Sequence, residues 1–265
     1  MRTASRDRVA DLVGNRALSA RSVLASALLG ADEPRLPVGS LVAIGSLFGI
    51  SDGATRTCLW RMVSNGELTS DDGTYALAGP LLERRRRVDA AAHAVDDAPK
   101  WDGTWELAIV SMDRRSPADR LTLRKAATAL HLAELREGVW IRPDNLDPDR
   151  LPGMRAVLDR QCVHFHHAAT DVPVQLARDL FRLPDWAADA RRLTEALTDE
   201  MDVDAVDATG FTYQFALSIA VVRHLQFDPL LPAELAPDDW PGPALRAAYR
   251  SFEETFKRRL YNAFR

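Results

Sequence analysis

Two patterns of apolar residues follow each other in the first part of the chain. Over residues 18–31, 38–49 and 51–65 apolar side chains recur every three to four positions, which predicts three short helices. Ser19 and Ser51 stand at the start of two of these runs and are predicted helix caps. The next segment, ELTSDDGTYALAG, alternates apolar and polar residues around Asp-Asp-Gly and predicts a β-hairpin. Three helices followed by a hairpin is the order of a winged helix-turn-helix.

The middle of the chain predicts alternating strands and helices. Apolar runs at 101–112, 137–143 and 161–170 predict strands, and amphipathic runs at 117–135 and 147–160 predict helices. The order strand, helix, strand, helix, strand is most simply a ferredoxin-like α/β sandwich. The remaining residues, 171–265, have helical periodicity with breaks at prolines.

The predicted fold class is therefore α+β, with an N-terminal winged helix-turn-helix, a central ferredoxin-like α/β sandwich and a C-terminal helical domain. A length of 265 residues suits two or three domains, and a hydrophobic content of 46 % supplies a sizeable core. The predicted boundaries are a tail or short arm at 1–18, the winged helix DNA-binding domain at 19–87, a linker at 88–100, the ferredoxin-like domain at 101–170 and the helical domain at 171–265.

Charge and cysteine content limit the function classes. The formal net charge is −4, so nucleic-acid binding requires a local basic patch instead of a global positive field. Cys58 and Cys162 are far apart in sequence, which argues against a disulfide framework and against a thiolate zinc site. No stretch approaches the ~20 apolar residues of a membrane span, and the first residues lack the apolar run of a signal peptide. We expect a cytoplasmic protein with no membrane contact.

The third predicted helix has one apolar side and one polar side. Arg56 lies early in it, where base edges are usually read, and an arginine with two hydrogen bonds to guanine discriminates by roughly 1–3 kcal/mol. Arg61 is better placed for a phosphate. The candidate DNA-binding residues are Ser51, Asp52, Gly53, Arg56, Thr57, Trp60 and Arg61 in this helix, Thr74 in the hairpin, and Arg84 and Arg85 after it.

The tip of the predicted hairpin is acidic, which is unusual for a wing. Asp71 and Asp72 precede Gly73 there, and we expect the tip to flank the DNA instead of entering a groove. Three helices with a hairpin also serve as protein-docking modules. A winged helix that binds a partner protein is therefore an alternative to a DNA-binding domain.

Three separated segments carry a family resemblance. They are LFGISDGATRTCLWRMVSNGEL at 47–68, the tryptophan-containing segment 101–143, and HLQFDPLLPAELAPDDWPGPALRAAY at 224–249. In this order they resemble the PaaX family of bacterial transcriptional repressors, which regulate phenylacetic acid catabolism and related aromatic pathways. The third segment, with its Asp-Pro, Leu-Pro and Trp-Pro-Gly, is the most specific of the three.

The resemblance implies a homodimeric repressor of an aromatic or acyl-CoA catabolic pathway. It implies binding to a partly palindromic double-stranded DNA operator, and release when an acyl-CoA such as phenylacetyl-CoA binds as effector. The sequence departs from relatives at Gly53, where a long charged residue is common, and at Trp60, where the usual residue is small. Both positions lie on the expected DNA-facing side, so the operator sequence and the inducer stay open.

An acyl-CoA effector needs apolar walls for its acyl group and cations for its phosphates. We expect it to bind between the central and C-terminal domains. Packing in the protein core is the alternative reading of the aromatic residues among the candidates. The candidate effector-binding residues are Arg124, Arg142, Tyr213, Phe215, Arg223, His224 and Trp240.

Enzymatic alternatives rest on few residues. His164 and His166 are predicted on one face of a strand and His167 on the other, a spacing that suits a metal but lacks a further ligand at matching distance in sequence. Asp113 follows the first central strand, and its carboxylate suggests a metal-dependent nuclease as an alternative, because ferredoxin-like domains also occur in nucleases. No phosphate-binding loop, nucleophile elbow or zinc-protease motif is present. We expect no enzyme, no catalytic residue, no metal site and no cofactor.

Overall fold

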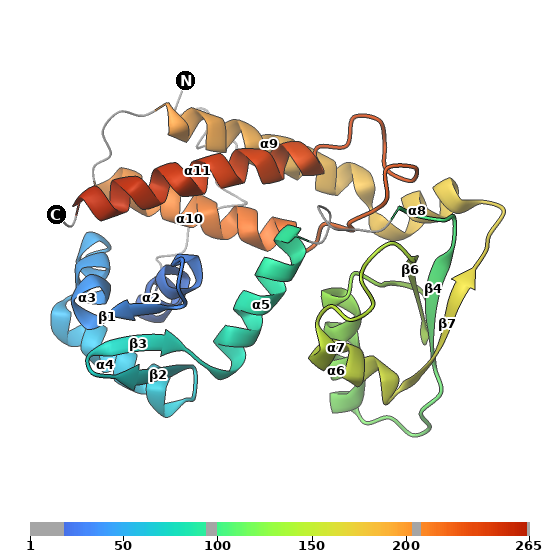
Figure 1. The fold of residues 1–265 in the computed structure, drawn as a ribbon, viewed down its shortest axis with the longest axis horizontal. Coiled ribbons are helices and arrows are strands. Elements are labelled where there is room, and N and C mark those ends of the chain that lie inside the picture. The colour runs from blue at the N-terminus through green and yellow to red at the C-terminus, as the bar shows by residue number, and fades with distance from the viewer. Residues whose placement is uncertain (1–18, 94–99, 203–207, 264–265) are drawn as a thin grey trace. The chain divides into compact units, whose positions relative to one another are not determined.

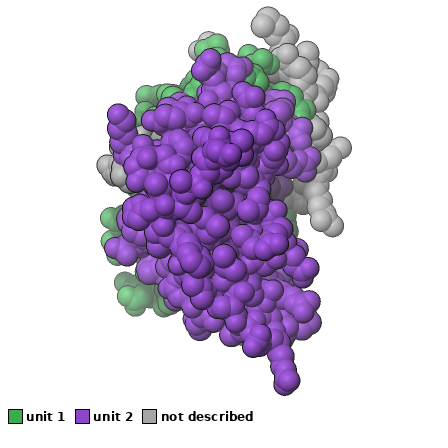
Figure 2. Space-filling view, turned by 90° about the vertical axis from the view of Figure 1, so that its right-hand side faces the viewer, with its two compact units in different colours: residues 1–86, 191–222, 244–265 green, residues 87–190, 223–243 purple. Residues whose placement is uncertain are grey.

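The computed structural model of the protein describes residues 19–93, 100–202 and 208–263. The chain divides into two compact units, coloured separately in Figure 2. Unit 1 comprises residues 1–86, 191–222 and 244–265, and unit 2 comprises residues 87–190 and 223–243. Each unit is described by itself below.

The N-terminal part of unit 1 contains three helices (Figure 1) and a small sheet. We call these helices and this sheet the three-helix module. The helices are α2 (Ala20–Gly30), α3 (Val38–Leu47) and α4 (Asp52–Ser64). Ser19 accepts a hydrogen bond from the Ser22 N–H at the start of α2, and Ser51 accepts one from the Ala54 N–H at the start of α4. Both predicted caps are therefore confirmed.

A three-stranded antiparallel sheet completes the three-helix module. Its strands are β1 (Arg35–Pro37), β2 (Leu68–Asp71) and β3 (Thr74–Leu77), in the order β1-β3-β2. The predicted hairpin is confirmed, and its turn residues Asp72 and Gly73 both have positive φ angles, 41° and 71°. Two successive positive φ angles suit the twist of a tight hairpin. Strand β1 was not predicted, because Arg35 and Leu36 lie between Pro34 and Pro37 in a segment that is typical of a break between helices.

The core of the three-helix module is formed by the apolar side of each helix and by one end of the hairpin. Apolar side chains every three to four positions meet there, as the helical period requires. Its buried members include Leu24, Leu28, Leu41, Leu59, Met62, Leu68, Leu77 and Leu81.

Helix α5 (Gly79–His93) follows the hairpin directly. The sequence predicts a linker at 88–100; α5 extends over residues 88–93 of it, and residues 94–99 lie outside the described part. The physical reason is composition: DAAAH, the end of α5, is rich in alanine, the strongest helix former. An arginine run alone did not signal a helix.

Unit 2 contains a four-stranded antiparallel sheet with the order β5-β6-β4-β7. The strands are β4 (Trp105–Val110), β5 (Ala133–Arg136), β6 (Val139–Pro143) and β7 (Cys162–Ala168), and the helices between them are α6 (Pro117–Ala129) and α7 (Pro152–Asp159). The element order β-α-β-β-α-β is ferredoxin-like, as predicted.

One strand of this sheet was missed from sequence. The predicted helix at 117–135 ends early, because His131 adopts a left-handed conformation with φ of 61° just after α6. Gly138, with φ of 77°, then makes the turn between β5 and β6. The segment HLAEL fits a helix and a strand equally well, so periodicity did not separate them.

Each face of the four-stranded sheet has an apolar core. On one face Ala108, Trp140 and Cys162 pack with residues of α6 and α7. On the other, Trp105 and Ile141 pack with Ala177 of α8 (Pro173–Phe181) and with Leu235.

The predicted helical character of 171–265 is confirmed by α8, α9 (Leu183–Met201), α10 (Ala208–Leu225) and α11 (Gly242–Ala263). This segment does not form a compact unit of its own, because its residues are divided between units 1 and 2. In unit 1, Phe211, Phe215, Phe252 and Phe256 form an aromatic cluster, and Phe48 at the end of α3 joins it with its ring centroid 4.9 Å from that of Phe215. No helix in the described ranges is long and apolar enough to span a membrane.

Candidate nucleic-acid interface

Helix α4 is fixed to the three-helix module by one side only. Thr55, Leu59 and Met62 are buried, and Gly45 of α3 approaches Thr55 so closely that an added Cβ would lie 2.6 Å from its hydroxyl oxygen. The helical period turns the remaining positions to solvent. The exposed residues of α4 are Asp52, Gly53, Ala54, Arg56, Thr57, Trp60, Arg61 and Ser64.

The structure therefore brings six predicted DNA-binding residues together on the exposed side of α4. They are Asp52, Gly53, Arg56, Thr57, Trp60 and Arg61. Trp60 is the most exposed of the large apolar residues in the described ranges, at 68 %. A Cβ added at Gly53 would meet nothing within 4 Å, so the first turn of this surface is open. We call these six residues the α4 surface.

Asp52 and Arg56 of the α4 surface form an ion pair. The Arg56 Nε donates a hydrogen bond to the Asp52 Oδ1 at 2.6 Å, and both side chains are 57 % exposed. Their spacing of four residues places them on adjacent turns of one helix face. Sequence reasoning placed both residues on this side but did not pair them, although the spacing of four was the available signal.

The other four predicted DNA-binding residues occupy different positions in the three-helix module and α5. Ser51 uses its side chain to cap α4, and Thr74 is half-buried beside the hairpin turn. Arg85 donates to the carbonyl oxygens of Leu29 and Ala31 at 2.6 and 2.7 Å, which satisfies the C-terminal end of α2. Arg84 is half-buried in α5. Arg85 thus has a structural partner that its sequence context did not reveal.

The hairpin borders an acidic hollow. A cavity of about 680 Å³ lies beside the three-stranded sheet, and Asp32, Glu33, Asp71 and Asp72 contribute to its lining. A hydrogen bond from Lys257 lowers the pKa of Asp32. Arg35 pairs with Glu33, and Lys257 pairs with Asp32, which offsets these two negative charges. Asp71 and Asp72 at the hairpin tip are exposed carboxylates, which repel phosphates.

The predicted effector-binding residues are divided between the two units. Tyr213 and Phe215 belong to unit 1, and Phe215 packs between Phe48 and Phe256 in the aromatic cluster. The other five belong to unit 2: Arg124, Arg142, Arg223, His224 and Trp240.

Two of these residues in unit 2 sandwich a tryptophan. The rings of His224 and Trp240 both stack on Trp186, with centroid distances of 4.5 and 4.6 Å. Burial lowers the pKa of His224, and its Nε2 lies 3.1 Å from the Trp186 carbonyl oxygen. This stacking accounts for the three rings as packing within unit 2.

Arg142 lies in the interior of unit 2 with 1 % of its surface exposed. Its guanidinium donates to the carbonyl oxygens of Pro143 and Leu130 and to the Asn145 side chain. Burial lowers its pKa to about 9, and the positive charge of Arg150 adds to this. Arg142 therefore serves the packing of unit 2, whereas Arg124 is exposed, 3.8 Å from Glu134.

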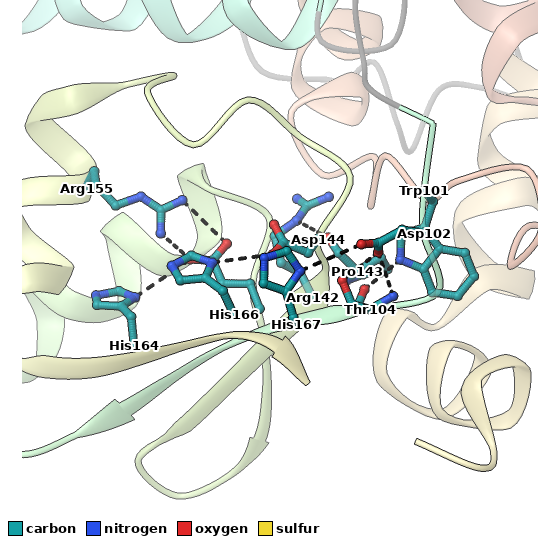
Figure 3. A network of polar contacts seen from close by, with 11 residues as sticks. Trp101, Asp102, Thr104, Arg142, Pro143, Asp144, Arg155, His164, His166 and His167 are labelled. Carbon is teal, nitrogen blue, oxygen red and sulfur yellow. Dashed lines mark hydrogen bonds and ion pairs between the residues drawn. The ribbon is translucent and has the colours of Figure 1, made fainter. Parts of the chain in front are cut away.

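The histidines of β7 each lie near a carboxylate, and Figure 3 labels the pairs of His166 with Asp144 and of His167 with Asp102. His164 Nε2 lies 3.1 Å from Asp159, His166 Nδ1 lies 3.4 Å from Asp144, and His167 Nδ1 lies 3.7 Å from Asp102. Across the described ranges, no three His, Cys, Asp or Glu residues are grouped to hold a metal ion. These contacts match ordinary polar pairing along a strand.

Glu106 is the buried carboxylate of this polar network. It forms an ion pair with Arg155, and His164 Nδ1 lies 3.7 Å from it. Burial alone would raise the pKa of Glu106, but the nearby His164 and the ion pair with Arg155 outweigh it and lower the pKa to about 2. The pair joins β4 to α7 and was not predicted from sequence.

The fold and the α4 surface together define an α+β protein that presents a solvent-facing helix from a three-helix module and carries a ferredoxin-like sheet. Family models match three consecutive parts of the chain. A PaaX-like protein model matches residues 19–81, the PaaX protein central Cas2-like domain matches residues 98–177, and the PaaX-like protein C-terminal domain matches residues 182–263.

The chain is also similar to solved structures. The uncharacterized protein Rv0674 from Mycobacterium tuberculosis is similar over 94 % of this chain and 100 % of its own, with 36 % sequence identity and a TM-score of 0.72. No curated protein matches the chain. The chain belongs to the PaaX family and is a PaaX-like regulator, which confirms the resemblance found in its sequence.

Proposed function

We propose that the chain is a transcriptional repressor that binds double-stranded DNA through the α4 surface. The observation that supports this most is the placement of α4: its apolar side is held in the core, and the six residues of the α4 surface, two arginines among them, face solvent. A helix held in this way fits the major groove, which is about 12 Å wide. The three-helix module is then a winged helix-turn-helix with the hairpin as its wing.

The residues of the α4 surface have distinct roles in this proposal. Arg56 lies one turn from the N-terminus of α4 and reads a base edge, whereas Arg61 lies farther along and contacts a phosphate. Trp60 contacts the DNA with an apolar ring, which suits a thymine methyl group or a sugar. The acidic hairpin tip stays beside the DNA.

Binding as a homodimer follows from the same proposal, because a partly palindromic operator needs two copies of α4 related by two-fold symmetry. An apolar strip on the edge of the four-stranded sheet supports it. Val163 and Phe165 of the edge strand β7 are 50 % and 49 % exposed, and they pair with Ile109 and Leu107 of β4 on the same face. We assign this strip, Val163 and Phe165, to the contact with a second copy.

The effector in this proposal is an acyl-CoA such as phenylacetyl-CoA, as membership in the PaaX family suggests. The effector must bind the DNA-free form more tightly than the DNA-bound form, because only a difference in affinity shifts the equilibrium. A difference of about 3 kcal/mol changes operator affinity by about 150-fold.

A gel shift tests the proposal. DNA from upstream of the chain's own gene is incubated with the full-length protein at fixed salt, with and without phenylacetyl-CoA. We expect retardation that the thioester abolishes. If the protein retards the DNA equally with and without the thioester, the repressor proposal stands and this effector is refuted. If it retards neither upstream nor selected DNA, a protein-docking module is favoured.

A further inference from the structure

The Asp52–Arg56 pair carries a more specific inference, which rests on the proposed function. We infer that Asp52 is a positioning residue that holds Arg56 so that its two terminal nitrogens recognise the N7 and O6 of one guanine in the operator. The two residues then act as one specificity unit, in which Arg56 contacts the base and Asp52 orients Arg56.

The geometry of the pair supports this division of labour. The hydrogen bond to Asp52 uses the Nε of Arg56, at 2.6 Å, and in the described ranges the guanidinium has no other partner. A guanidinium has five N–H donors, so Nη1 and Nη2 keep theirs for a ligand. With Nε occupied, the approach to guanine is end-on through Nη1 and Nη2, and both acceptors of the guanine major-groove edge are reached.

Because Asp52 already orients Arg56 in the free protein, Arg56 loses less side-chain entropy when it binds DNA. A free arginine loses rotamer freedom when it docks, and a group already held by a neighbour loses less. Asp52 is itself well placed, because it occupies the first turn of α4 behind the Ser51 cap, where the helix dipole favours a carboxylate.

The space around the pair is open to a base pair. A Cβ at Gly53 would meet nothing within 4 Å, and Thr57 is small. A long side chain at either position would stand beside the guanidinium and compete for the same groove. The absence of such a side chain in the first turn is what lets the base edge approach Arg56.

Arg61 provides a matched comparison on the same surface. It lies on the exposed side of α4, but the residue four positions before it is Thr57, and no carboxylate in the described ranges pairs with it. An arginine that is not held in place suits a phosphate, which tolerates many approach directions. Arg61 is therefore the control for loss of one positive charge without loss of base recognition.

The test starts from duplexes selected by the full-length protein from a random library. The selected duplex is the probe, and each guanine in turn is replaced by 7-deazaguanine, which lacks the N7 acceptor. We expect one position at which this replacement weakens binding about tenfold. Inosine at that position keeps N7 and O6 and should bind as guanine does, which identifies a major-groove contact.

The variant Asp52→Ala then separates positioning from simple contact. We expect the ratio of guanine to 7-deazaguanine affinity to fall about three- to tenfold, and Asp52→Glu to restore much of it. Arg56→Ala should bring the ratio of guanine to 7-deazaguanine affinity close to one. Arg61→Ala should weaken binding to all duplexes equally and leave this ratio unchanged. Helical circular dichroism checks that each variant is folded.

Two outcomes would overturn the inference in different ways. If Asp52→Ala binds more weakly or more tightly but keeps the wild-type ratio, Asp52 does not position Arg56 and the proposed function stands. If the wild-type protein enriches no duplex from the library, the proposed function fails and this inference fails with it.

Discussion

Gly45 shows how one residue fixes the placement of α4. A Cβ added there would lie 2.6 Å from the Oγ1 of the fully buried Thr55, so α3 and α4 approach at this point as closely as a glycine allows. A larger residue must push the two helices apart or distort Thr55. The angle at which α4 presents its exposed side therefore depends on the absence of a side chain at position 45.

We expect Gly45→Ala to destabilise the protein by about 1–3 kcal/mol, because it overpacks a buried contact. Gly39→Ala in the same helix is the matched control, since a Cβ there meets nothing within 4 Å and the greater helix propensity of alanine should stabilise by about 0.5–1 kcal/mol. Urea unfolding followed by circular dichroism measures both. Equal effects at the two positions would contradict the close approach of α3 and α4.

Glu106 makes the stability of unit 2 depend on pH. Its pKa is about 2 in the folded protein and near its ordinary 4.5 when unfolded, so folding favours the ionised form. The stabilisation is fully present above about pH 5 and is lost as the pH falls toward 2, and its size is up to about 3 kcal/mol.

We therefore expect Glu106→Gln to lower the unfolding free energy at pH 7 and to have a smaller effect at pH 3. The reason is that the wild-type carboxyl group is losing its advantage there, while the amide does not titrate. Urea unfolding at a series of pH values, followed by circular dichroism, measures the difference. A constant difference between the two proteins across this range would refute the role of Glu106 in acid sensitivity.

At the scale of elements, the hairpin contributes negative charge beside the α4 surface. Asp71 and Asp72 are exposed at its tip, and Asp72 has a positive φ angle that asparagine also tolerates. The turn can therefore lose a charge without losing its shape.

We expect Asp72→Asn to increase affinity for DNA about two- to fivefold at low salt, because it removes repulsion from nearby phosphates. The gain should shrink as salt screens the charge. Glu134→Gln in unit 2 removes the same charge elsewhere and controls for net charge. Fluorescence anisotropy with a labelled duplex at two salt concentrations measures both, and weaker binding by Asp72→Asn would show that the tip makes a favourable contact.

Elements with strong local signals were predictable from sequence, and elements defined by partners were not. Helices α2 and α4 begin after serine caps, and the β2–β3 hairpin has an Asp-Gly turn, so local chemistry specified them. Strand β1 exists because Leu36 pairs with Tyr75 on a distant strand, which no local pattern encodes. The same limit applies to the site. The helical period predicted which side of α4 is exposed, whereas the hydrogen bonds of Arg85 to the end of α2 could be found only from the folded structure.

At the scale of the whole molecule, the C-terminal third is not a separable part. Phe215, Phe252 and Phe256 belong to the core of unit 1, whereas Ala177 and Leu235 belong to the core of unit 2. Sequence predicted the helices but not this division, because periodicity gives the buried side of a helix without its partner. Removing residues 171–265 would therefore expose apolar surface in both units, so point variants are better suited than truncation to locating the effector site.

The assignment of Val163 and Phe165 to the homodimer contact leads to a prediction for the whole molecule. We expect Phe165→Glu to shift the protein toward a monomer, because it places a charge in an apolar contact. Operator affinity should fall at least about tenfold, since two linked copies of α4 bind more tightly than one. Leu121→Glu on α6, also an exposed apolar position, is the control. Sedimentation equilibrium measures the oligomeric state, and an unchanged mass for Phe165→Glu would place the contact elsewhere.

The distribution of tryptophans gives the molecule an intrinsic optical reporter. Trp60 stands in solvent on α4, whereas the other five are buried or half-buried in unit 2. A soluble quencher such as acrylamide reaches an exposed indole first, so the quenchable part of the emission comes mainly from Trp60. Occupancy of the α4 surface can then be followed in the unlabelled protein by how far a ligand shields this one ring.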